Sequence, residues 1–553
     1  MTEDEKDSEF EKAPVVVEKP GGLLSNTPWW LVSVGIHMVL LLGATLIAIE
    51  QLHAFDPVDP VVYVRPIVPQ PLITEIPRTL DKGPSGVPLE DKIEANLSND
   101  KIFFDPNALP DDHAESDDGE LTHKRKGEGE QYLGYVPGKS DGFRGKQVGQ
   151  TAGVYDTMGI GGGAGGSGRY GGRIGGSRNL RPQGKGRQTA VTEDAVRAAL
   201  KWLAHHQSPD GGWGAGTYAQ QCTGGRCSGL GDASFDTGVT ALSVLAFLGA
   251  GYTPLSKDEE PDPCDPSRTI RYGDTVKRGL QWLLGHQDPE GCVGERGEKY
   301  MYNHAIAALA LSEAYGMTAS QILRDPAQKA IDFVIAAQNP GKGWRYSSKC
   351  GDNDTSVTGW AVMALKSAEL SELPFPKNAF EGALNWLTEA TSTKDGYYRV
   401  GYNARDTGKV YVPGKNEQFD DHPALSAVSV MSRIFIQKNK REPALTAVTL
   451  IASDLPQWKA QKVDFYYWYY ASLALFQYDG PDGPIWLKWN EPMKNAIVPH
   501  QKGRADGCRT GSWDPEEDRW GFEGGRVYAA AINALTLEVY YRYENVFGGG
   551  QKK

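Results

Sequence analysis

The chain has 553 residues, of which 40% are hydrophobic and 23% are charged, and its net charge is −12. This acidic balance argues against nucleic acid as a partner. The basic residues scattered among glycines, Arg169, Arg173 and Arg178, resemble RNA-binding glycine-arginine tracts only faintly and do not change that expectation.

The first predicted elements are an acidic tail over residues 1–28 and a membrane anchor over residues 29–49. The stretch from Trp29 to Ile49 has no formally charged residue and has about the length needed to cross a bilayer. A cleaved signal peptide is the less favoured alternative, because the stretch is long, an acidic tail precedes it and no small-x-small cleavage site follows it. Lys12 and Lys19 precede the span, and the first base after it is Arg65. Positive charge nearer the N-terminal side of the span predicts a single-pass protein of a bacterial inner membrane with its C-terminal part in the periplasm.

Two polar residues inside this span, Ser33 and His37, lie four apart and therefore on one helix face. The passage Leu31-Val-Ser-Val-Gly-Ile-His37 resembles the membrane helix of TonB-type energy transducers, whose Ser and His face a proton-driven motor. The resemblance implies coupling of Ser33 and His37 to a motor complex of that type. An uncharged His in an ordinary anchor is the equally weighted alternative.

Residues 50–189 have the composition of a disordered linker. Prolines recur from Pro57 to Pro110, an acidic cluster occupies residues 111–120, and residues 161–176 are mostly glycine. Such segments cannot bury enough apolar surface to fold, so we expect a flexible periplasmic tether.

The C-terminal part repeats one phrase, found at residues 199–213, 279–291 and 330–344. Each copy has apolar residues at helical spacing and ends in Gln-x-Pro followed by glycine, which predicts a helix and a tight turn. A second, more apolar helix follows each copy, and three degenerate copies continue the series. Internal repetition at this scale predicts stacked helical hairpins. The marker residues of the repeat are Gln207, Trp213, Gln287, Gln338, Trp344, Gln501 and Trp513.

Six hairpins with apolar first and last members predict a closed ring, since an open solenoid needs polar caps. We therefore expect an all-α fold, a single α/α toroid over residues 190–545, followed by a flexible tail at 546–553. The phrase resembles the repeats of squalene-hopene cyclases and protein prenyltransferase β subunits. The resemblance implies that each Gln satisfies open helix-end groups and that each Trp packs against the next helix.

Two catalytic patterns of these families are incomplete here. Cyclases use an Asp-x-Asp-Asp acid motif, and the matching stretch has only Asp352 and Asp354. The pair Asp506-Gly-Cys508 resembles part of the prenyltransferase zinc site, but the third ligand is missing, so we expect no metal and no cofactor. Whether the chain is an enzyme stays open, with Asp352, Asp354 and His304 as catalytic candidates. Cys222 and Cys227 flank a short loop that could close as a disulfide outside the cytoplasm.

Polar residues at the starts of the inner helices gather at one mouth of the predicted ring. The candidate ligand-binding residues are Asp236, His304, Asp354, Asp421, His422, Tyr467 and Arg526. Helix capping is the alternative for each Asp. Two function classes remain: a module that binds a lipid, isoprenoid or glycan or that scaffolds partners, and a prenyl-type transferase or cyclase. The incomplete catalytic motifs favour binding.

Overall fold

The computed structural model describes residues 37–38, 170, 173, 186–543 and 546, apart from 224, 263, 266, 395, 408–409 and 441. The membrane span predicted at residues 29–49 therefore lies outside the described residues except for His37 and Met38, which are helical. Within the described part of the chain, no helix is both long and apolar enough to cross a membrane.

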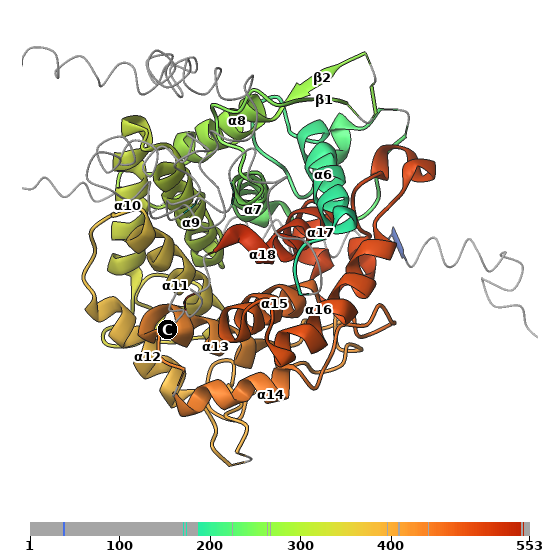
Figure 1. Cartoon of the computed structure of the whole chain (residues 1–553). Helices are drawn as coiled ribbons and strands as arrows, with labels where there is room; N and C mark the ends of the chain where they lie inside the picture. The colour runs from blue at the N-terminus through green and yellow to red at the C-terminus, as the bar shows by residue number, and fades with distance from the viewer. Residues whose placement is uncertain are drawn as a thin grey trace, which may run out of the picture. The chain divides into compact units, whose positions relative to one another are not determined.

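Helices dominate the described residues and alternate between an outer and an inner layer (Figure 1). The outer layer consists of α6 (Ala190–His205), α8 (Tyr272–Gly285), α10 (Gln321–Ala337), α12 (Asn378–Glu389), α14 (Ala447–Ile451) and α16 (Pro484–Ile497). The inner layer consists of α7 (Asp236–Gly249), α9 (Tyr300–Thr318), α11 (Thr355–Leu370), α13 (Ala424–Gln437), α15 (Phe465–Asp479) and α17 (Gly521–Leu537). The remaining elements are α18 (Val539–Arg542), the antiparallel hairpin of β1 (Glu259–Pro261) with β2 (Thr269–Arg271), and the 3-10 turns η6 (Tyr218–Gln221), η7 (Ala233–Phe235), η8 (Pro443–Thr446), η9 (Val498–His500), η10 (Arg504–Arg509) and η11 (Pro515–Glu517).

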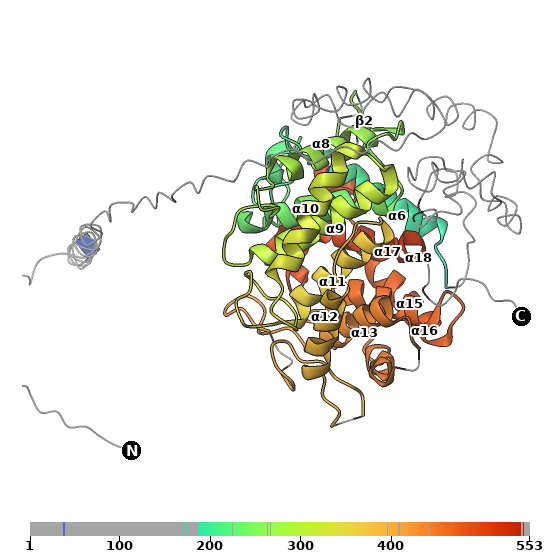
Figure 2. The same cartoon turned by 90° about the vertical axis from the view of Figure 1, so that its left-hand side faces the viewer.

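The inner helices form a closed ring, because each contacts the next and α17 contacts α7. Figure 1 shows this closure as the red end of the chain lying beside its green start, and Figure 2 shows α8, α10 and α12 following one another along one side. The inner helices are buried almost throughout, whereas the outer helices bury one face. The predicted all-α toroid is therefore confirmed.

The repeated Gln residues join neighbouring hairpins. Each Gln Nε2 donates to a carbonyl of its own turn and to a carbonyl at or near the next outer helix. Gln207 reaches Thr275 at 2.9 Å, and Gln338 reaches Ala379 at 2.9 Å. Gln501 makes the same bond across the join of the ring, to the Ala195 carbonyl at 2.8 Å. Each Gln side chain thus links its own turn to the first half of a neighbouring outer helix.

The repeated Trp residues are fully buried, and each indole Nε1 donates to a carbonyl near the end of the preceding helix. Trp213 binds Leu203 at 2.8 Å, Trp344 binds Val334 at 2.7 Å, and Trp513 binds Ile497 at 2.8 Å. Each Trp therefore combines a large apolar contact with a satisfied polar group.

Two residues of the predicted linker are buried at the end of the ring where the inner helices terminate. The Arg173 side chain is 0% exposed and donates from Nη1 to Glu313 Oε2 at 2.6 Å, while Arg542 lies 3.4 Å from the same carboxylate. The Tyr170 hydroxyl binds Ser371 at 2.8 Å. Tyr170 and Arg173 thus contact the toroid although they precede residue 190, where its start was predicted, and their polar groups can be buried because they are paired.

Candidate functional site

A cavity of about 300 Å³ lies at the mouth where the inner helices begin. All six inner helices contribute residues from their N-terminal parts to the cavity wall. These residues include Gly238, Tyr302, Ser356, Ala424, Tyr466 and Tyr528. The parallel arrangement of the inner helices brings their N-terminal parts to one place. The cavity volume is at the lower end of that of small-molecule sites.

The cavity wall is rich in aromatic rings. Besides the tyrosines of the inner helices, it includes Phe235, Tyr346, Trp360, Tyr402, Tyr411 and Trp520. Several hydroxyls bond to one another: Tyr302 donates to Ser356, Ser356 lies 2.5 Å from the Tyr466 hydroxyl, and Tyr346 contacts Tyr402. The Tyr528 hydroxyl is buried and has no hydrogen-bond partner within the described residues. Aromatic faces are therefore the main surface that the cavity offers to a ligand.

The charged and amide groups of the wall are mostly paired within the protein. Lys299 binds Glu523 at 3.0 Å, and Arg519 lies 3.9 Å from Asp464. The Asn303 amide donates to the Ser234 carbonyl at 2.7 Å. Because these groups already have partners, few remain for a polar ligand.

Two of the predicted ligand-binding residues, Asp421 and His422, do line the cavity. His422 Nδ1 lies 2.6 Å from Asp454 Oδ2, and its ring stacks on Tyr467 at 5.0 Å between centroids. Burial lowers the pKa of His422, but the hydrogen bond to Asp454 and the Asp464 carboxylate outweigh it, so the pKa lies above its usual value.

The other predicted mouth residues are not among the lining residues. Asp236 accepts from the Ala215 amide at 2.7 Å, and the Tyr467 hydroxyl donates to the Asp454 carbonyl at 2.9 Å. Arg526 is fully buried and binds Asp514 at 2.5 Å. These side chains hold loops and helix starts in place. Neighbouring residues line the cavity in their place, as Tyr466 does beside Tyr467.

His304 has a structural role. Its Nδ1 accepts from the Val293 amide at 3.0 Å, and its Nε2 lies 3.1 Å from the Ala330 carbonyl, so both ring nitrogens are used. In other repeats Thr358 accepts from the Trp344 amide in the same way. Burial lowers the pKa of His304 to about 4, so the ring is neutral at pH 7. His304 is not among the residues that line the cavity.

The two acid candidates, Asp352 and Asp354, differ sharply. The Asp352 side chain is 76% exposed, which leaves it in water. Asp354 is buried, and its Oδ1 accepts from the Val357 amide at 2.7 Å as the N-cap of α11, while Oδ2 has no hydrogen-bond partner among the described residues. Burial raises the pKa of Asp354 to about 7, against the opposing effects of the Val357 amide and Arg345. Asp354 lies outside the cavity lining.

The cysteine prediction requires a correction. Cys222 and Cys227 are free cysteines and form no disulfide with each other. Both sulfur atoms instead lie near His206 Nε2, together with that of Cys508. The expectation of no metal site rested on a missing third ligand, and these described residues supply enough ligands to revise it.

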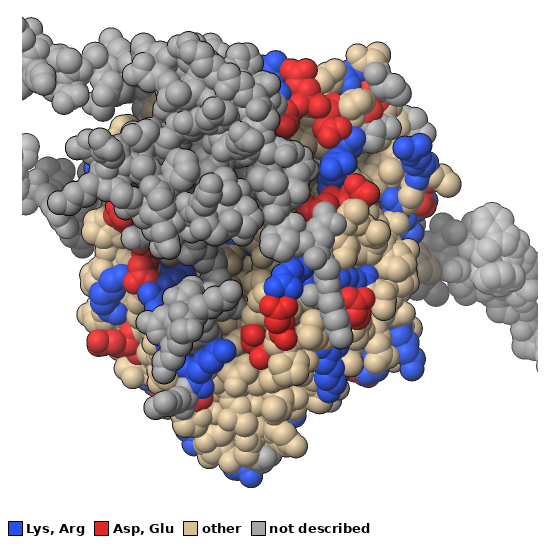
Figure 3. Space-filling view, in the orientation of Figure 1, with Lys and Arg blue, Asp and Glu red and all other residues tan. Residues whose placement is uncertain are grey.

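The molecular face shown in Figure 3 has Lys and Arg side chains interspersed with Asp and Glu. Outside the grey atoms no single sign of charge dominates this face. A continuous basic stripe, which nucleic-acid binding requires, is not visible there.

Comparison with known proteins supports the class of the fold. Residues 269–434 match the family model described as the squalene-hopene cyclase C-terminal domain. No curated protein matches the chain. This match supports a toroid of the squalene-hopene cyclase and prenyltransferase class, because it spans the hairpins from β2 into α13.

Solved structures with some likeness include an inactive α-1,6-mannanase of Salegentibacter sp. in complex with α-1,6-mannotetrose, with 11% identity, TM-score 0.43, and coverage of 64% of this chain and 99% of that one. An α-amylase from Clostridium perfringens gives 11% identity, TM-score 0.41, and coverage of 65% and 99%. A type II terpene cyclase from Scytonema gives 13% identity, TM-score 0.39, and coverage of 64% and 96%. These likenesses are too distant to indicate a ligand or a reaction.

Proposed function

We propose that this chain is a membrane-tethered periplasmic toroid that binds an apolar ligand of the isoprenoid type in its central cavity. The observation that carries the proposal is the concentration of aromatic side chains in the cavity wall, contributed both by the inner helices and by the loops around their N-terminal ends. An isoprenoid gains affinity from burial against such faces and needs few hydrogen bonds. A glycan is the less favoured ligand, because the polar groups of the wall are mostly bonded to the protein itself.

Binding without chemistry fits the acid candidates better than cyclisation does. An acid that protonates an alkene must contact the substrate. Asp354 has the raised pKa that such an acid needs, but it is not among the cavity-lining residues, and Asp352 is exposed. Product formation from an isoprenoid probe would favour the enzyme alternative, in which Asp354 is the proton donor.

The ligand class can be tested with farnesol as a neutral isoprenoid probe and mannotriose as a glycan probe. Trp360 and Trp520 line the cavity, so binding should change the tryptophan fluorescence of the full-length protein. Ala424→Trp should fill the cavity from α13 and abolish the farnesol response, whereas Ala190→Trp at the exposed start of α6 should preserve it. Mannotriose binding with no farnesol binding would contradict the proposed ligand class.

The membrane part of the proposal depends on the apolar stretch at residues 29–49. Ser33 and His37 add the proposal that a TonB-type motor complex contacts this helix, with a plain anchor as the alternative. His37→Leu should leave the protein in the membrane and abolish its co-purification with such a complex, while Met38→Leu serves as the control. If the His37→Leu variant still co-purified with the motor complex, residues 29–49 would serve only as a membrane anchor.

A further inference from the structure

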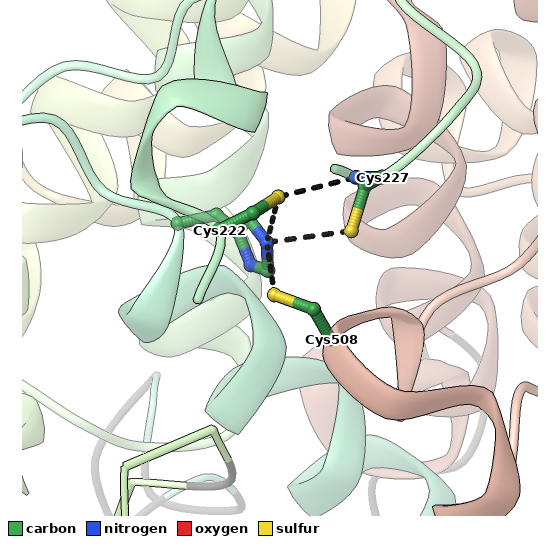
Figure 4. Close-up of side chains that lie close together, drawn as sticks. Cys222, Cys227 and Cys508 are labelled. Atoms are coloured by element: carbon green, nitrogen blue, oxygen red, sulfur yellow. Dashed lines mark hydrogen bonds between the residues drawn. The ribbon is translucent and has the colours of Figure 1, made fainter. Parts of the chain in front are cut away.

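Four side chains far from the central cavity converge on one point. His206 follows α6, Cys222 and Cys227 flank the loop after η6, and Cys508 lies in η10. Figure 4 shows the three cysteine side chains pointing toward one another around an imidazole ring. The sulfur atoms of Cys222, Cys227 and Cys508 lie 3.5, 3.6 and 3.4 Å from His206 Nε2.

Hydrogen bonding alone does not account for three sulfur atoms around one nitrogen. His206 Nδ1 lies 2.8 Å from the Trp202 carbonyl, which can only accept, so Nδ1 carries a proton and donates it. In the neutral ring Nε2 then has one lone pair and can accept a single S–H. The arrangement leaves this lone pair directed at a group of thiols, as it would be directed at a metal ion.

The distances fit a tetrahedral zinc ion. Zinc binds sulfur at about 2.3 Å and imidazole nitrogen at about 2.05 Å, which places each sulfur about 3.6 Å from the nitrogen. The observed sulfur–nitrogen distances of 3.4 to 3.6 Å agree with this value. All four ligand atoms lie within 4.8 Å of one another, so shifts of about 1 Å bring them to tetrahedral positions.

The surroundings support a metal site as well. The Trp202 carbonyl fixes the tautomer of His206, and the Trp202 indole stacks on the ring at 4.1 Å. The Cys227 amide donates to Cys222 Sγ at 3.2 Å, and the Cys264 thiol donates to Cys508 Sγ at 3.4 Å. Donors of this kind orient metal ligands and stabilise thiolate charge.

We propose that His206, Cys222, Cys227 and Cys508 bind a structural zinc ion that joins the first hairpin to the last. Three thiolates and one imidazole complete the coordination of zinc and leave no open position for a substrate. None of the four residues lines the central cavity, so the site is separate from the proposed ligand site. The soft sulfur ligands favour zinc over magnesium or calcium.

The proposed zinc ion lies at the join of the ring. His206 and Cys508 are 302 residues apart in sequence, and the Trp202 indole also donates to the Cys508 carbonyl at 3.0 Å. The ion therefore connects segments that the chain itself connects only around the entire ring. Metal binding to such a preformed site contributes directly to the stability of the closed fold.

The test measures zinc in the full-length protein, extracted in mild detergent from cells grown with zinc. We expect about one zinc ion per wild-type chain. The Cys508→Ser variant should retain less than about a tenth of this amount. Cys350→Ser removes an exposed cysteine outside the site and should retain the metal. Cys264→Ser should also retain it, because Cys264 contacts a ligand and not the ion. If the Cys264→Ser variant lost its zinc and the Cys222→Ser variant retained it, the assignment of the zinc ligands would be contradicted.

A second measurement on the wild-type protein covers the case in which Cys508→Ser does not fold. Stepwise titration with an organomercurial reagent should release zinc as the ligand thiols react, and cobalt exchanged into the site should show the intense thiolate charge-transfer bands of a tetrahedral sulfur site. Purified wild-type protein without zinc, or with a Cys222–Cys227 disulfide found by mass spectrometry, would overturn the proposal.

Discussion

The unusual protonation of Asp354 leads to a prediction about stability and pH. Asp354→Asn keeps an oxygen that can accept from the Val357 amide, and Asn caps helices about as well as Asp. The amide nitrogen takes the place of Oδ2, which has no hydrogen-bond partner among the described residues. The substitution therefore resembles the protonated acid, but it cannot ionise.

The direction in which stability changes with pH follows from the raised pKa of Asp354. The folded protein holds the Asp354 proton up to about pH 7, whereas the unfolded chain loses it near the usual value of 3.8. Stability supplied by the protonated acid is therefore complete below pH 3.8 and is lost as the pH rises to about 7. At about 1.4 kcal/mol per pH unit, the wild-type protein should lose about 3 kcal/mol relative to Asp354→Asn between pH 5 and pH 8.

Urea denaturation of both proteins at pH 5 and pH 8, followed by tryptophan fluorescence, measures this difference. Asp352→Asn is the matched control, because Asp352 lies in the same loop but is exposed to solvent. The difference between the control and wild type should be independent of pH. If Asp354→Asn also shows the same stability difference at both pH values, Asp354 ionises normally and the argument from burial fails.

Three further substitutions test other parts of the structure. Trp344→Ala should destabilise the protein by about 3 to 5 kcal/mol through cavity formation, as measured by its urea midpoint; an unchanged midpoint would contradict its structural role. Glu313→Gln should cost about 3 to 5 kcal/mol, because it leaves buried arginines without their carboxylate, and the melting temperature should fall. Tyr528→Phe should leave stability unchanged and weaken farnesol binding, whereas Tyr315→Phe, away from the cavity, should not affect binding. Equal binding by both variants would show that the Tyr528 hydroxyl does not contact the probe.

The toroid was predictable from the repeated sequence because the repeated residues make contacts with residues close to them in the chain. A Gln after an outer helix and a Trp in the following turn both bind nearby backbone carbonyls, so they recur at nearly constant spacing. The binding mouth was predictable from the same periodicity. Its residues were not, because neighbouring side chains at a helix start point in different directions: Tyr466 lines the cavity, whereas the adjacent Tyr467 donates to the Asp454 carbonyl outside the lining.

The cysteine cluster could not be predicted from spacing alone. Cys222 and Cys227 are close in sequence and suggested a disulfide, whereas Cys508 meets them only after the ring has closed. His206 carried no signal of its own, since it occupies a helix end where imidazoles also bind backbone carbonyls. Long-range convergence of this kind requires the three-dimensional fold.

The burial of Arg173 also determines how the ring would respond to mechanical load. A force applied along the chain before residue 170 would act first on the Tyr170 hydrogen bonds and on the Arg173–Glu313 ion pair, and only afterwards on α6. The hydrogen bonds that join neighbouring hairpins, such as that from Gln501 to the Ala195 carbonyl, do not involve Tyr170 or Arg173. The two contacts could therefore break under load while the ring stays closed.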